Sequence, residues 1–208
     1  ISVAFMLAFP LYFQLMPSLL DDDMIAGGSS GPSGDWEVGF AETPITLEDE
    51  TGPLGNDDTY PTEFAVMSEL NIGYVELNVE CNDNDEPGPG ATDRAEGSSD
   101  VSDVEGEFED QNEEGPCSGG DSGFTMRWDV THNYTGQNIT VEDMSEVEIR
   151  SMWNDGGFGE GMWAATITAD INTAPIIGGV LDSSEEYYIT WTAMTYELVL
   201  QPVIDVEA

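Results

Sequence analysis

Apolar and polar residues alternate with a period of two over much of the chain from Trp36 onward. Such alternation is typical of a strand that buries one face and exposes the other. We see no convincing helical periodicity in this part of the sequence. We therefore expect a mainly β head, built as an antiparallel, immunoglobulin-like β-sandwich of about seven strands with Gly, Asn, Asp and Pro turns. The alternating segments are residues 36–40, 75–81, 124–130, 146–150, 163–171 and the tail 187–206.

The charge balance restricts the environment and the partners of this head. The chain of 208 residues has 43 Asp and Glu, 3 Lys and Arg, no lysine at all, and a formal net charge of −40. Nucleic acids and anionic membrane surfaces bind clustered cations, so we expect neither as a partner. Self-repulsion of this size opposes compaction, but in molar salt the Debye length falls to about 3 Å and screens it. The composition is similar to that of proteins from extreme halophiles, chiefly haloarchaea, and an acidic mesophile protein is the alternative.

An apolar stretch opens the chain. Residues 1–20, ISVAFMLAFPLYFQLMPSLL, carry no charge, include two prolines that would kink a helix, and are followed by three aspartates. About 20 apolar residues can span a bilayer as a helix. We predict an apolar N-terminal helix over residues 1–23, a flexible Gly/Ser-rich linker over 24–35 and the head over 36–208. The residues expected to pack against other copies are Val3, Phe5, Met6, Leu7, Phe9, Leu11, Tyr12, Phe13, Leu15, Met16, Leu19 and Leu20.

The N-terminal layout resembles that of type IV pilins and archaellins. In those families the precursor is cleaved just before the apolar stretch, and here the stretch begins at Ile1 without a basic flank. The segments RWDVTHNYTGQNITVEDMSEVEIRSMW (127–153) and DSSEEYYITWTA (182–193) are similar to strand–turn–strand segments of haloarchaeal pilin heads and of other surface β-sandwiches. The resemblance implies a homo-oligomeric helical filament at the cell surface, joined through residues 1–20 after an initial stay in the membrane, with adhesion or motility roles.

Other interpretations of the same layout remain open. The apolar stretch fits a plain membrane anchor, or an apolar arm buried in a neighbouring subunit. The first would make the chain a membrane-anchored envelope or virion surface protein of a haloarchaeon or its virus. An extracellular enzyme or solute-binding module is a further alternative.

Two cysteines bracket the most acidic part of the head. The 35 residues between Cys81 and Cys117 include 13 carboxylates and one arginine. Because such a stretch has little to bury, we expect an exposed loop over residues 82–116. We expect a Cys81–Cys117 disulfide to close it, which would indicate an oxidising, extracytoplasmic setting. Two free thiols are the alternative.

Two N-glycosylation sequons lie close together. They are Asn133-Tyr134-Thr135 and Asn138-Ile139-Thr140, in a turn-rich stretch. In an exported chain they predict N-glycans on Asn133 and Asn138. The alternative is a β-turn that uses Asn and Gly for its geometry.

The sequence offers little catalytic chemistry. The single histidine, His132, lies in the turn-rich stretch and is expected to be a turn or surface residue. There is no P-loop, no G-x-S-x-G and no H-E-x-x-H motif. We therefore expect neither an enzyme nor a cofactor.

Two clusters carry the oxygen ligands that Ca²⁺ and Mg²⁺ prefer. Neither has the spacing of an EF-hand, so we expect hydrated carboxylates and no specific metal site. The clusters are Asp83, Asn84, Asp85 and Glu86, and Asp155 with Glu160.

We expect the tryptophans of the head to fill the core rather than to bind a ligand. They are Trp128, Trp153, Trp163 and Trp191.

Overall fold

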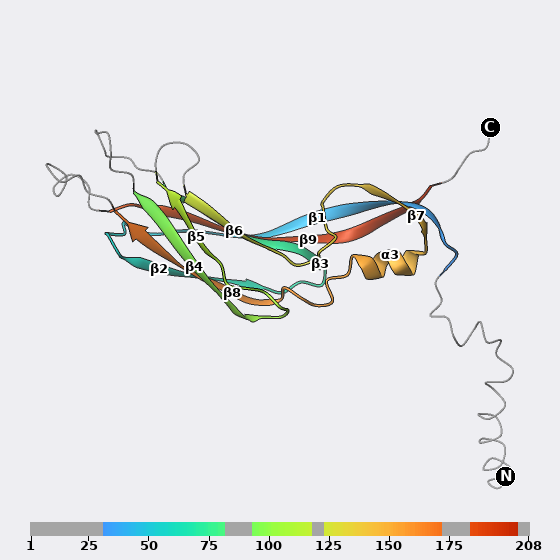
Figure 1. Cartoon of the computed structure of the whole chain (residues 1–208), viewed down its shortest axis with the longest axis horizontal. Coiled ribbons are helices and arrows are strands. Elements are labelled where there is room, and N and C mark those ends of the chain that lie inside the picture. Colours follow the sequence, from blue (N-terminus) through green and yellow to red (C-terminus); the bar gives the residue numbers. More distant parts are fainter. Residues whose placement is uncertain (1–30, 82–92, 118–122, 172–183, 204–208) are drawn as a thin grey trace, which may run out of the picture. The chain divides into compact units, whose positions relative to one another are not determined.

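The computed structural model describes residues 31–81, 93–117, 123–171 and 184–203 (Figure 1). The predicted N-terminal helix, its contact residues, most of the predicted linker and the cluster at 83–86 lie outside the described residues. The chain divides into two compact units. Among the described residues, the larger unit contains those within 39–138 and 153–199, and the smaller contains residues 31–38, 200–203 and Ile139–Met152.

The described residues form nine strands and one short helix. The first strand begins at Gly34, just before Trp36. The elements are β1 (Gly34–Glu50), β2 (Thr59–Val66), β3 (Asn71–Cys81), β4 (Arg94–Val104), β5 (Asn112–Pro116), β6 (Gly123–Asp129), β7 (Ile139–Met144), α3 (Glu146–Met152), β8 (Gly161–Asp170) and β9 (Tyr187–Pro202).

Two antiparallel sheets contain these strands, in the orders β6-β3-β9-β1-β7 and β2-β8-β4-β5. The pairs are nested: β4 lies beside β5, β3 beside β6, β2 beside β8 and β1 beside β9. The chain is therefore one long antiparallel hairpin folded over on itself, with β7 and α3 inserted between β6 and β8. This is the strand order of a jelly roll, in which eight strands form two Greek keys.

The prediction of a mainly β, antiparallel two-sheet head is confirmed, whereas the immunoglobulin-like strand order is wrong. In an immunoglobulin domain the first two strands are neighbours in one sheet. Here β1 and β2 belong to different sheets. Alternation identifies a strand and its buried face, but it does not say which strands pair, so the sequence could not separate the two topologies.

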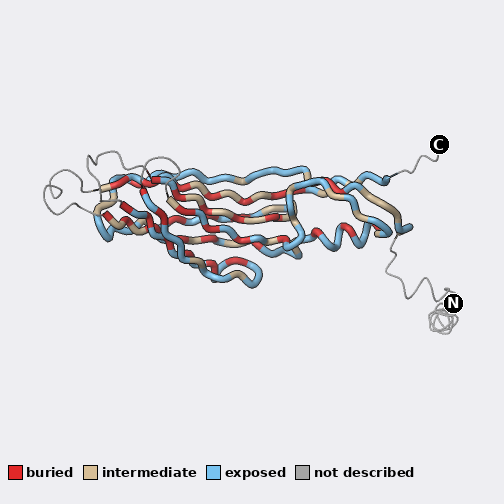
Figure 2. Tube along the Cα trace, turned by 45° about the horizontal axis from the view of Figure 1, so that its top comes forward, coloured by how far each residue is buried: buried red, intermediate tan, exposed pale blue. Residues whose placement is uncertain are grey.

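The two sheets of the larger unit enclose one core (Figure 2). Trp128 of β6 lies between Trp163 of β8 and Trp191 of β9, with ring centroids 5.1 and 6.3 Å apart. Trp153 is also buried, so all four tryptophans predicted to fill the core do so. Phe64 of β2 stacks on Trp191 across the sandwich, at 5.8 Å.

Residues 146–150 form helix α3 and not the predicted strand. Ser145 and Glu148 make a capping box, because Ser145 N–H donates to the Glu148 carboxylate at 2.8 Å and Glu148 N–H donates to Ser145 Oγ at 3.3 Å. Arg150 pairs with Glu146 one turn earlier, at 2.8 Å. Only Ile149 is buried in the helix. The short alternation was compatible with either structure, and the S-x-x-E cap decides for the helix.

The prediction of an acidic loop over 82–116 is wrong where the structure places strands, at β4 and β5. Residues on β4 alternate regularly between exposed and buried up to Val101. The buried positions are small, and Gly97 is the extreme case: a Cβ there would lie 2.3 Å from Cζ of Phe124 on β6. Carboxylates occupy the outer face, so the segment is acidic and still packs into the core.

In the smaller unit, the beginning of β1 pairs with β7, from Gly34 opposite Met144 to Val38 opposite Ile139. The Val203 N–H also donates to the backbone oxygen of Asp35, at 2.8 Å. The described part of the chain therefore begins and ends on neighbouring strands.

Candidate functional site

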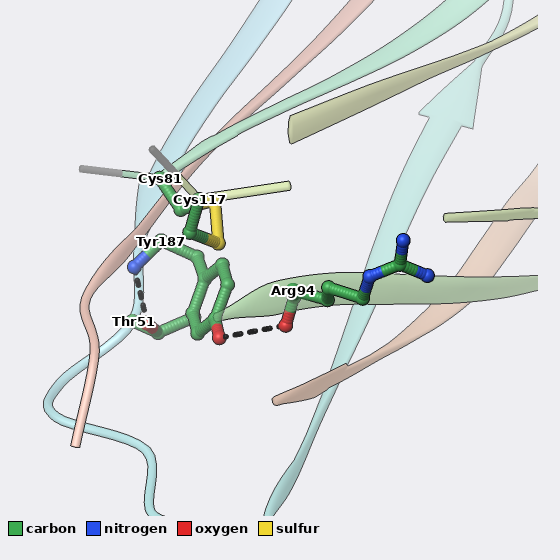
Figure 3. Close-up of a disulfide and its surroundings, with 5 residues drawn as sticks. All are labelled: Thr51, Cys81, Arg94, Cys117 and Tyr187. Carbon is green, nitrogen blue, oxygen red and sulfur yellow. Dashed lines mark hydrogen bonds between the residues drawn. A yellow bond between two sulfur atoms is a disulfide. The ribbon is translucent and has the colours of Figure 1, made fainter. Parts of the chain in front are cut away.

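The disulfide joins the two sheets at one end of the larger unit (Figure 3). Cys81 is the last residue of β3, and Cys117 follows β5. Their sulfurs are 2.04 Å apart and both residues are buried, which confirms the predicted pairing. Tyr187 lies beside the disulfide, donating its N–H to Thr51 Oγ1 at 2.9 Å. The bridge thus closes a segment that includes two core strands rather than a free loop.

The first sequon lies in a turn that is anchored to the core by the buried residue Thr131. Tyr134 N–H donates to the backbone oxygen of Thr131 at 3.0 Å, which closes a turn around His132 and Asn133. Thr131 is buried and donates its hydroxyl to the backbone oxygen of Ile72 at 2.7 Å. The side chains of His132 and Asn133 are exposed. His132 is therefore a surface turn residue, as the sequence predicts.

Tyr134 fixes this turn onto the sheet. Its ring stacks on Tyr196 of β9 with centroids 4.7 Å apart. It also covers Gly73 so closely that a Cβ on that glycine would lie 2.5 Å from the ring. The Tyr134 hydroxyl donates to the Glu42 carboxylate. Burial, and then this hydrogen bond, raise the pKa of Tyr134 well above its usual value, so the phenol stays protonated as a donor. No motif in a single sequence indicates this contact set.

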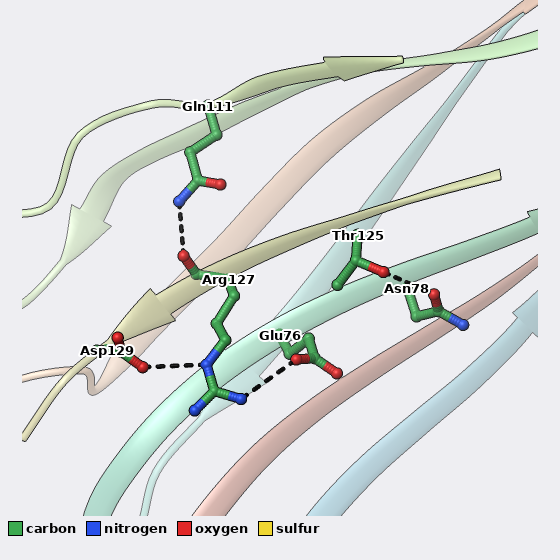
Figure 4. Close-up of polar contacts among 6 residues, drawn as sticks. All are labelled: Glu76, Asn78, Gln111, Thr125, Arg127 and Asp129. Atoms are coloured by element: carbon green, nitrogen blue, oxygen red, sulfur yellow. Dashed lines mark hydrogen bonds and ion pairs between the residues drawn. The ribbon is translucent and has the colours of Figure 1, made fainter. Parts of the chain in front are cut away.

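An arginine organises the outer face of the five-stranded sheet (Figure 4). The guanidinium of Arg127 lies over the ring of Tyr74, 3.6 Å from its centroid. Its Nε bonds Asp129 at 3.0 Å, and Nη1 lies 3.5 Å from Glu76, its cross-strand neighbour. Beside it, Thr125 donates to Asn78 Oδ1 at 3.0 Å. The charge of Arg127 is thus shared between two carboxylates and an aromatic ring.

Carboxylates in the loop before β8 accept hydrogen bonds from backbone N–H groups. Asp155 accepts the N–H of Ile72 at 2.8 Å with one oxygen and that of Gly157 at 2.9 Å with the other. Glu160 accepts the N–H of Ser68 at 3.4 Å. Within the described residues, no group of three or more His, Cys, Asp or Glu is placed to hold a metal ion. Asp155 and Glu160 therefore join the loop before β8 to residues 68–72 through hydrogen bonds.

A shallow hollow of about 440 Å³ lies on the four-stranded sheet. Glu96 of β4 is directly opposite Glu114 of β5, and Arg94 Nη1 bonds Glu114 at 2.9 Å. The lining has no histidine, cysteine or large apolar residue, so it lacks the features of a small-molecule site. The lining residues are Glu96, Gly97, Ser98, Asn112, Glu113, Glu114 and Thr168.

Three of the sheet edges in the larger unit, at β1, β2 and β5, are poorly suited to pairing with another chain. The fourth edge strand, β6, has no proline, and the side chain of Gln111 donates to its backbone at Arg127, at 2.7 Å. Strand β1 has β9 on one side and β7 on the other, but β7 covers it only as far as Val38. After Val38, no described strand pairs with that second side of β1. Proline interrupts this edge at Pro44, and the edge strands β2 and β5 contain Pro61 and Pro116. Proline and exposed charge both oppose edge-to-edge association. The carboxylates on these strands include Glu42, Glu48, Glu63, Glu113 and Glu114.

Comparison with known families and with curated proteins found no family model and no protein that match the chain. Among the described residues, no helix has both the length and the apolar character to cross a membrane.

Proposed function

We propose that the chain is a structural subunit of a pilus-like filament on the surface of an extreme halophile, with adhesion or motility roles. In this proposal residues 1–20 pack against like copies at the filament axis and the jelly-roll head faces the surroundings. The buried Cys81–Cys117 disulfide supports a site outside the cytoplasm, because such bonds persist in oxidising compartments. The formal net charge of −40 supports a head that stays hydrated in concentrated salt.

The observation that carries the proposal is the self-contained head. Most of its large apolar side chains meet in one core, although Met67 and Phe158 are exposed, and the open edges at β1, β2 and β5 carry proline and carboxylates. Such a head gives another copy little to pair with, so assembly falls to the apolar stretch 1–20. Burying that stretch would gain about 25 cal/mol per Å² of apolar surface, and salting-out ions strengthen the effect.

Electron microscopy of the purified protein in high salt tests the proposal. We expect helical filaments, and we expect Leu15→Asp to abolish them because the charge would fall in the assembling stretch. Leu47→Asp is the matched control, since Leu47 is an exposed residue of β1 and its replacement should leave filaments intact. Thermal unfolding of the head should be the same in both variants. Particles, or monomers that need detergent, would overturn the filament.

A membrane-anchored envelope or virion surface protein is the second candidate. The jelly-roll strand order favours it, because this order recurs in viral coat and lectin domains. A fold alone does not assign a function. Here the same apolar stretch would hold single heads in a bilayer, and flotation with lipid vesicles in place of filaments would support this candidate.

A further inference from the structure

The two sequons have different local structures, and the first is presented for modification. Asn133 lies in the turn closed by Tyr134, and its side chain is exposed. Trp153 Nε1 donates to the backbone oxygen of Asn133 at 2.8 Å, so the core holds the backbone while the side chain faces solvent. Thr135, two residues on, is also exposed, and its hydroxyl bonds only Gln137 among the described residues, at 3.3 and 3.5 Å.

The second sequon is built into a sheet. The side-chain oxygen of Asn138 lies only 3.1 Å from the position of a Cβ on Gly39, so the amide packs over that glycine. Ile139 and Thr140 are the first residues of β7 and pair with Val38 and Glu37 of β1. A transferase must hold the asparagine and the hydroxyl of the sequon threonine in one active site. The side chains of Asn138 and Thr140 are exposed as well, so the difference lies in the backbone, which is paired here. To bring both groups into its active site, the transferase would have to pull β7 away from β1.

We infer that Asn133, and not Asn138, is the residue of the folded head that accepts an N-linked glycan. The donor class is an oligosaccharide carried on a lipid phosphate, used by a transferase of the host. The side-chain nitrogen of Asn133 forms a bond to C1 of the first sugar. The bond from C1 to the phosphate oxygen breaks, the lipid phosphate leaves with the electron pair, and the amide proton passes to a base of the transferase.

This inference rests on the export part of the proposed function and not on the filament. Filaments without a glycan would refute only the inference, and a glycan on a protein that forms no filaments would refute only the filament. The two failures are therefore distinguishable in one preparation.

Peptide mapping of the protein from the cells that produce it tests the inference. Trypsin cuts after Arg127 and Arg150 and leaves both sequons on one peptide, residues 128–150. Electron-transfer fragmentation, which keeps the sugar attached, then places the added mass. We expect it on Asn133 alone. A sugar on Asn138, or an unmodified peptide, would overturn the inference.

Matched variants made in the same host separate modification from folding. Asn133→Gln and Thr135→Val should both abolish the added mass, whereas Asn138→Gln and Thr140→Val should leave it in place. Near-ultraviolet circular dichroism in high salt verifies that each variant is folded, and Thr135→Val tests the first sequon without touching Asn133. Loss of the sugar in a folded Asn138→Gln variant, or its retention in Asn133→Gln, would contradict the assignment.

Discussion

Strand β4 and the five-stranded sheet of the larger unit bury the same core with residues of different size. The five-stranded sheet faces inward with large side chains, such as Leu77, Met126 and Trp191. In the four-stranded sheet, β4 faces inward with Ala95, Gly97 and other small residues, and the volume is filled by aromatic side chains from opposite strands. A strand can therefore belong to the core while its sequence looks like an acidic loop, provided that its inward positions are small.

The outer faces of the two sheets differ as well. On the five-stranded sheet Glu76 is opposite Arg127, an attractive cross-strand pair. On the four-stranded sheet Glu96 is opposite Glu114, a repulsive one. Arg94 bonds Glu114 nearby, but both side chains are about half exposed, so the gain is small. The four-stranded sheet should accordingly depend more on screening by salt.

Removal of salt should have the largest effect. Below about 0.5 M salt the Debye length grows, repulsion among the carboxylates strengthens and the head should lose its cooperative fold. Tryptophan fluorescence during thermal unfolding at decreasing salt measures this loss. Hydrogen exchange should show the amides of β4 and β5 losing protection first. A melting temperature that does not change with salt would contradict the screening argument.

Removal of the Cys81–Cys117 disulfide, which links the two sheets, should have the second largest effect on stability. Cys81→Ser combined with Cys117→Ser frees a segment with a sequence separation of 36. The entropy model then gives a loss of about 3 to 4 kcal/mol in the free energy of unfolding. Chemical denaturation in high salt measures it, and reductant should lower the stability of the unaltered protein to a similar degree. If the double variant is as stable as the parent, the segment is already ordered in the unfolded chain.

Filling the space above Gly97 tests how tightly the small-residue strand packs. A methyl group there would lie 2.3 Å from Phe124 and 2.8 Å from Met126. Gly97→Ala should therefore lower the free energy of unfolding by about 1 to 3 kcal/mol. Gly52→Ala is the control, since nothing lies within 4 Å of its Cβ position. Adding Phe124→Leu should recover part of the loss, and full tolerance of Gly97→Ala alone would show that β4 packs loosely.

The smallest expected effect comes from removing a single carboxylate on the outer face of each sheet, and it should differ in sign between the two sheets. Glu96→Gln removes one charge of a like-charged pair and should stabilise the head by about 0.2 to 1 kcal/mol. The gain should shrink as salt rises. Glu76→Gln is its matched counterpart and should destabilise the head, because it takes a partner from Arg127. Equal effects of the two substitutions would remove the proposed difference between the sheets.

The sequence predicted those strands whose inward residues are large. Alternation in β3, β6, β8 and β9 is clear because apolar residues, many of them large, recur at every second position. The disulfide followed from the presence of only two cysteines. The sequence did not reveal β4, whose inward Ala, Gly and Ser carry no apolar signal, and it did not reveal β2, where Pro61 interrupts the pattern.

The candidate site was predictable only in its parts. The sequons and the surface position of His132 can be read from the sequence. The difference between Asn133 and Asn138 cannot, because it depends on which residues of β1 pair with Ile139 and Thr140. The contact of Tyr134 with Gly73, Tyr196 and Glu42 joins four distant parts of the chain. Such contacts are set by strand order, which a single sequence does not specify.

The adjacency of Asp35 and Val203 has a mechanical consequence. The hydrogen bonds of an antiparallel pair run across the strands. Tension applied between these two points would separate β1 from β9 by breaking their hydrogen bonds one after another, which requires little force. A load between the beginning of β1 and the beginning of β9, which lie at opposite ends of this pair, would instead strain many such bonds together. A head tethered through its beginning alone is therefore loaded in its stronger direction when something pulls on its far end.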